Sequence, residues 1–152
     1  MTDTELDSSV AALRALLVKD IDTAGRLRGE LDSDGRRAYA VLLGTAFSRA
    51  VNRRFRGHHT NADIIEFVAE ARARYPRTGE MVGAEDAERV IRAALGENHL
   101  IDTLDWRSIG AAQTAVLFAL VHEDNDGLEE VDALLAGAAA DAAAYLRRRA
   151  RR

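Results

Sequence analysis

The chain has 152 residues, no cysteine, one proline and a formal net charge of −4 at pH 7. Without cysteine, disulfide bonds and cysteine-ligated zinc or iron–sulfur sites are excluded. A hydrophobic fraction of 47% beside a charged fraction of 30% is typical of a globular protein with its own core. Alanine-rich and arginine-rich segments favour helix over sheet. We therefore expect an all-α fold, in which residues 1–152 form a single-domain bundle of six or seven helices.

Two amphipathic helices are predicted at the start of the chain. Residues 4–19 place apolar side chains at helical spacing, at Leu6, Val10, Leu13 and Leu17. A shorter helix is expected over about residues 22–30. The turn at residues 31–35 then offers Asp32 or Ser33 as the N-cap of a third helix.

The third predicted helix, about residues 36–55, organises the rest of the chain. Its apolar stripe consists of Tyr39, Leu42, Leu43, Ala46, Phe47, Ala50, Val51 and Phe55. The offsets of three and four place these side chains on one helical face. Val41 and the small residues Ala38, Ala40 and Gly44 widen the stripe in the first half, which is typical of a buried helix. We expect this helix at the centre of the bundle.

Clear start and stop signals bound the later helices. Further helices are expected over residues 61–75, 84–95, 105–122 and 128–146. Gly57 suits the end of the third helix, Thr60 with Asp63 forms a capping box, and Pro76 ends the helix that the box opens. We expect Trp106 to anchor the first turn of its helix against a neighbour. Residues 147–152 form a basic arginine tail.

Charge is distributed unevenly along the sequence. Residues 36–77 carry +6, residues 78–146 carry −11 and residues 147–152 carry +5. The candidate contacts for nucleic acid or phosphate are Arg49, Arg53, Arg54, Arg56, His58, His59, Arg147, Arg148 and Arg149. Arginine suits this role because its planar guanidinium donates two hydrogen bonds together. The alternative is that these arginines cover the central helix with their stems and pair with the acidic C-terminal half.

The sequence carries no recognisable catalytic or metal-binding pattern. No G-x-S-x-G elbow, P-loop or dinucleotide fingerprint is present. The Asp-rich turns before Gly35 and Gly127 lack the closing carboxylate of a calcium loop. His58, His59 and Asp63 have no further ligand at a definite spacing. We therefore expect no catalytic residue, no cofactor and no metal, although an enzymatic role stays open.

These observations favour a non-enzymatic helical module for protein–protein interaction or regulation. Its partner is another protein or a second copy, and the alanine-rich helix at residues 128–146 is the expected self-association surface. The alternative is a nucleic-acid-associated protein that uses residues 49–59 and the arginine tail. Since no apolar leader or membrane-length apolar run occurs, we expect a cytoplasmic protein with no membrane partner.

Overall fold

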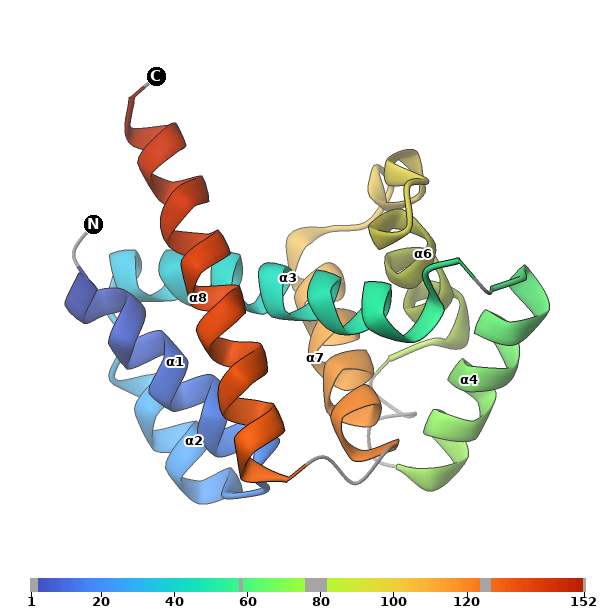
Figure 1. Cartoon of the computed structure of the whole chain (residues 1–152), viewed down its shortest axis with the longest axis horizontal. Helices are drawn as coiled ribbons and strands as arrows, with labels where there is room; N and C mark the ends of the chain where they lie inside the picture. Colours follow the sequence, from blue (N-terminus) through green and yellow to red (C-terminus); the bar gives the residue numbers. More distant parts are fainter. Residues whose placement is uncertain (1–2, 58, 76–81, 124–126, 152) are drawn as a thin grey trace. The chain divides into compact units, whose positions relative to one another are not determined.

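The computed structural model describes residues 3–57, 59–75, 82–123 and 127–151. Within these ranges the chain forms seven α-helices and one short 3-10 helix, with no strand. They are α1 (Asp3–Leu17), α2 (Ile21–Gly29), α3 (Ser33–Phe55), α4 (Asn61–Arg74), α6 (Ala84–Ala94), η1 (Asn98–Ile101), α7 (Trp106–Glu123) and α8 (Leu128–Ala150) (Figure 1). The predicted all-α helical bundle is confirmed.

The helices fall into two compact units. The first unit consists of Met1–Ala46 with Val121–Arg152, and the second unit is Phe47–Leu120. Two helices, α3 and α7, continue from one unit into the other. The single-domain organisation stays a prediction, which the cooperativity of unfolding can test.

The apolar stripe of α3 is buried along its whole length. Leu42 and Val51 have no exposed surface, and Phe47 and Phe55 are almost fully covered. The burial predicted for the central helix is therefore confirmed. The widening of the stripe is confirmed only in part, because Ala38 is fully buried but Ala40 is exposed. Val41 and Gly44 are half-buried.

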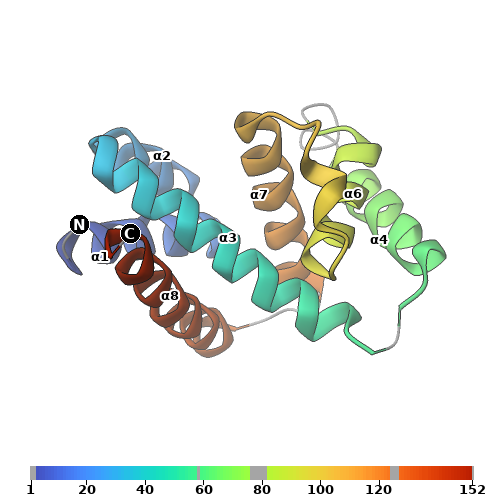
Figure 2. The same ribbon diagram turned by 90° about the horizontal axis from the view of Figure 1, so that it is seen from above.

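The first unit groups α1, α2 and α8 around the first half of α3 (Figure 2). Helix α1 packs against both α2 and α8. The fully buried Ser9 hydroxyl donates to the carbonyl oxygen of Gly35 at 3.2 Å, which ties α1 to α3. The Thr45 hydroxyl donates to the carbonyl oxygen of Ala138 at 2.9 Å, which ties α3 to α8. These bonds satisfy polar groups inside an otherwise apolar contact.

An ion pair also joins α1 to α8. Arg14 Nε donates to Asp132 Oδ1 at 2.7 Å. This hydrogen bond, with the charge of Arg14, lowers the pKa of the Asp132 carboxyl. Because both side chains are exposed, the pair orients α8 more than it stabilises the fold.

The second unit packs α4 against α6, and α6 against η1. The rings of Phe55 and Phe67 meet edge to face, with centroids 5.5 Å apart. Tyr75 and Phe118 make a similar contact at 5.3 Å, between the end of α4 and α7. Edge-to-face pairs suit the quadrupoles of aromatic rings and add to the stabilisation that burial gives.

The predicted helix boundaries are largely reproduced. Asp32 caps α3 by accepting from the Gly35 amide at 2.7 Å, so this helix begins three residues earlier than expected. Both bonds of the capping box between Thr60 and Asp63 are present. Gly57 takes a positive φ of 83°, which suits glycine at a helix end. The predicted stop at Pro76 and the turn at residues 124–126 lie outside the described residues.

Candidate interaction surfaces

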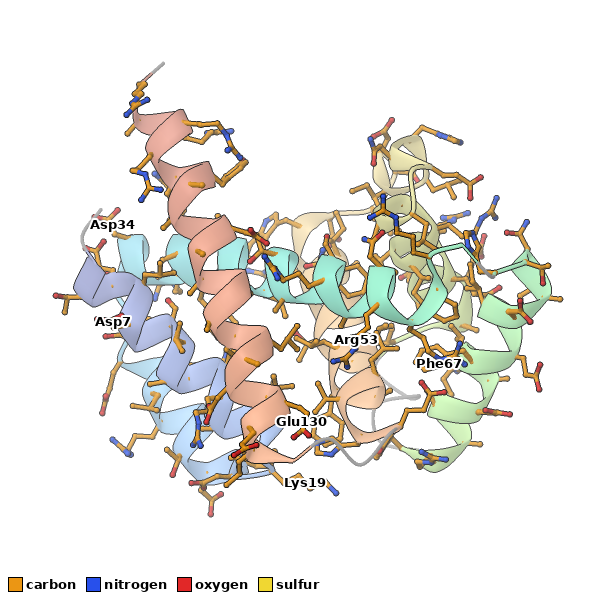
Figure 3. The ribbon with its side chains drawn as sticks, viewed as in Figure 1. Asp7, Lys19, Asp34, Arg53, Phe67 and Glu130 are labelled. Atoms are coloured by element: carbon orange, nitrogen blue, oxygen red, sulfur yellow. The ribbon has the colours of Figure 1, made fainter. Side chains whose placement is uncertain are left out.

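The arginine-rich segment lies at the end of α3, in the second unit. Arg49, Arg53 and Arg54 are exposed in its last two turns, and Arg56 is exposed directly after it; Figure 3 labels Arg53. His59 is exposed in the following loop, while His58 lies outside the described residues. The structure thus brings the described members of this segment to one end of one helix.

Arg54 covers the aromatic contact between α3 and α4. Its guanidinium carbon lies 4.9 Å from the ring centre of Phe55 and 5.9 Å from that of Phe67. A guanidinium at this distance from an aromatic ring is attracted by its quadrupole. This position of Arg54 agrees with the alternative prediction, in which the aliphatic parts of the arginine side chains cover the central helix.

The His59 side chain caps the C-terminal end of α3. Its Nδ1 lies 2.8 Å from the carbonyl oxygen of Phe55. Since a carbonyl oxygen can only accept, the bonded tautomer carries its proton on Nδ1. The imidazole therefore satisfies one of the carbonyls that a helix leaves unpaired at its C-terminus. One of the two loop histidines thus has a structural role.

Acidic and basic groups of the second unit face each other near this loop. Arg92 donates from Nε and Nη2 to the two carboxylate oxygens of Glu97, both at 2.8 Å. This bidentate pair with Arg92 lowers the pKa of the Glu97 carboxyl. The pairing therefore favours the ionised Glu97 carboxylate, which neutralises the charge of Arg92.

The charge balance of the two units differs. The second unit contains ten arginines and ten acidic residues, so its formal charge at neutral pH is zero. The first unit carries the whole net charge of −4. A nucleic-acid-binding domain usually has a basic excess. The charge balance of the second unit instead favours pairing of the segment at residues 49–56 with acidic groups of the same unit.

The remaining candidate arginines belong to the first unit. Arg147, Arg148 and Arg149 are exposed in the last turns of α8, which continues beyond the predicted end at residue 146. Arg149 Nη1 lies 3.5 Å from the Tyr145 hydroxyl. These C-terminal turns extend past α3 (Figure 1). The basic tail is thus largely helical and presents its charges along one helix.

Trp106 is a surface residue, and the prediction that it anchors α7 against a neighbour is wrong. Its side chain is 77% exposed, and the Arg107 guanidinium lies 5.3 Å from its ring centre. Asp105 caps α7 by accepting from the Ser108 amide at 2.7 Å, so Trp106 occupies the first helical position. A side chain there leans toward the helix N-terminus and projects beyond the first turn.

A second exposed surface runs along α8, the alanine-rich helix that the sequence suggested for self-association. We call it the α8 outer face, and it consists of Glu129, Ala133, Ala136, Ala140, Ala144, Arg147 and Arg151. These residues recur at three or four positions and lie opposite the buried side of α8. Ala144 is half-buried and the others are exposed. The buried side consists of Val131, Leu135, Ala138 and Ala142.

A shallow apolar depression lies between α4, α6 and α7 in the second unit. Its lining includes Phe67, Val82 and Val116, with Arg72 and Tyr75 as its polar members. Side chains of this kind can contact apolar groups, but they do not supply the general acid and general base that proton-transfer catalysis needs. The depression therefore gives no support to a catalytic reading.

In the parts of the chain that the structure describes, no three His, Asp or Glu side chains gather as metal ligands would. Over the same residues, no helix is both long and apolar enough to cross a membrane. Compared with known protein families, curated proteins and solved structures, the chain gives no match.

Proposed function

We propose that this chain is a non-enzymatic, cytoplasmic interaction module that acts by self-association through the α8 outer face. The observation that carries the proposal is a solvent-facing stripe of alanines with acidic residues at its start and arginines at its end. Alanine lets two helix axes approach to about 8 Å. It also loses no side-chain entropy on burial.

The position of α8 in the first unit supports this proposal. One side of the helix is buried, and the Thr45 hydroxyl and Arg14 guanidinium bond to its backbone and to Asp132. A helix fixed in this way presents its other side without first having to fold. Such preorganisation reduces the entropic cost of association.

Sedimentation equilibrium at micromolar concentrations tests the proposal. We expect the wild-type chain to sediment with an average mass above the 16.6 kDa of the monomer, rising with concentration. Ala140→Glu places a charge at the centre of the α8 outer face and should leave only the monomer. The matched control is Ala69→Glu on the exposed side of α4, which should associate like the wild type. A wild-type chain that stays monomeric throughout would refute the proposal.

Nucleic-acid binding is the second candidate. The exposed arginines at the end of α3 and in the last turns of α8 favour it, and the zero net charge of the second unit weighs against it. A mobility-shift series in salt separates the two functions, because binding through phosphates weakens steeply as salt rises. We expect no retarded band even at low salt. A salt-sensitive band that is lost on replacing Arg147 and Arg148 by glutamine would favour this second function.

A further inference from the structure

We propose that two copies of this chain pair through their α8 outer faces in antiparallel orientation, about a two-fold axis at Ala140. The inference rests on the proposed function and specifies its partner and geometry. Its basis is the order of charges along α8. Because the two ends of the helix carry opposite charges, a second copy that runs in the opposite direction is electrostatically complementary to it.

Opposite charges occupy the two ends of the outer face. Glu129 lies in the first turn of α8, with Glu130 of the same turn beside the outer face and labelled in Figure 3. Arg147 lies in the last turn of α8, and Arg151 is its C-cap. With a rise of about 1.5 Å per residue, Glu129 lies about 16 Å before Ala140 and Arg151 about 16 Å after it. An antiparallel partner therefore brings its Arg151 level with Glu129 at both ends, with its Arg147 about one turn nearer the axis.

The small residues follow the same symmetry. Ala136 and Ala144 lie equally far from Ala140, so each meets its counterpart when the second helix runs in reverse. Ala133 lies as far before Ala140 as Arg147 lies after it, and its small side chain leaves room for the arginine stem. The axis thus passes through the contact of Ala140 with its own copy, with one Ala136–Ala144 contact on each side, where two helices can come closest.

A parallel pair would have the opposite electrostatics. It would place glutamates beside glutamates and arginines beside arginines, and like charges in contact oppose association. The helix dipoles would also point the same way instead of opposing each other. An antiparallel pair repeats each contact twice and closes, so association stops at the dimer.

Charge reversal with mixing tests the orientation. One variant carries Glu129→Arg and Glu130→Arg, and the other carries Arg147→Glu and Arg151→Glu. Each variant alone should self-associate about tenfold or more weakly than the wild type, because like charges then meet at both ends. An equimolar mixture should regain dimers of wild-type strength. Circular dichroism of each variant serves as the control that α8 still folds.

The outcomes separate this inference from the proposed function. If the wild type dimerises and neither variant alone is weakened, self-association stands and the antiparallel pairing is overturned. The same conclusion follows if the variants are weakened and mixing restores nothing. If the wild type is a monomer at every concentration, the proposed function falls and this inference falls with it.

Discussion

The two units expose apolar surface in different ways. The first unit presents an extended face of alanines, flanked by glutamates at one end of α8 and arginines at the other. The second unit, in its described residues, presents separate large side chains, Ile65 on α4 and Trp106 on α7, with Arg107 beside the tryptophan ring. An isolated tryptophan needs a pocket on a partner before it contributes binding energy. The α8 outer face is complementary in charge to a second copy of itself. The order of charges along α8 therefore identifies the partner more clearly than the amount of exposed apolar surface does.

The two units also share the helices α3 and α7, and the largest predicted effects concern α3. Leu42→Ala removes a buried side chain of α3 in the first unit, and Phe55→Ala removes one in the second. Each should lower the free energy of unfolding by about 2–5 kcal/mol, from lost burial and the cavity left behind. Since α3 and α7 continue through both units, urea unfolding followed by circular dichroism should show one shifted transition for both variants. Two separate transitions in either variant would contradict the single-domain prediction.

A smaller effect is predicted at Tyr39, in the first unit. Its side chain is almost fully buried, and among the described residues its hydroxyl has no hydrogen-bond partner. Removing this hydroxyl with Tyr39→Phe should raise the free energy of unfolding by about 1 kcal/mol at neutral pH. The exposed Tyr145 gives the control, Tyr145→Phe, with no expected gain. A less stable Tyr39→Phe variant would show that the hydroxyl has a stabilising contact.

We also expect Tyr39 to make the free energy of unfolding depend on pH. Burial raises the pKa of Tyr39, and this outweighs the lowering by Arg28, whose guanidinium carbon lies 5.3 Å from the ring centre. The folded state therefore holds this proton more tightly than the unfolded state. Its contribution to stability is full below the unfolded pKa of about 10 and falls as the pH rises above it. Tyr39→Phe should lose less stability than the wild type between neutral pH and about pH 11.

The helix caps allow a matched comparison of the two units. Asp32 accepts from the Gly35 amide in the first unit, and Thr60 accepts from the Asp63 amide in the second. Replacing either by alanine should lower the free energy of unfolding by about 1 kcal/mol. Asp32→Asn and Thr60→Ser keep an acceptor and should lose much less. If these conservative variants lose as much as the alanine variants, the caps are not the cause.

The smallest effects are expected at Trp106. Trp106→Ala should change the free energy of unfolding by less than about 0.5 kcal/mol, because the side chain is mostly in solvent. It should also leave self-association unchanged. As the chain contains one tryptophan, its fluorescence reports this position alone. A blue shift of the emission as concentration rises would place Trp106 in the contact and would contradict the assignment to α8.

Much of the fold could be predicted from local signals. The stripe on α3, the capping box at Thr60 and the glycine at Gly57 each act within a few residues, and such short-range chemistry is visible in the sequence. The burial of Leu42 and Phe47 followed from spacing alone. The outward position of Ala40 did not, because a small apolar residue is compatible with either side of a helix.

The candidate surfaces were harder to predict. The spacing of arginines showed a basic segment, but not that Arg54 stacks on the rings of Phe55 and Phe67, since that contact joins two helices. Trp106 was expected inside because it is large and apolar. Its place at the first helical position, directly after the Asp105 cap, was the signal that it could project beyond the helix end. The alanines of α8 are compatible with either side of the helix until the buried side is known.

The most direct test of the α8 pairing uses the absence of cysteine from the chain, because Ala140→Cys then introduces a single thiol. At a two-fold axis this thiol meets its own copy, so mild oxidation should link most of the protein into a disulfide-bonded dimer. Ala133→Cys lies on the same outer face but about 10 Å from the axis along α8, so it should stay unlinked. Rapid linkage of the Ala140→Cys variant alone is the predicted result. Equal linkage of both variants, or linkage of neither, would contradict antiparallel self-association through α8.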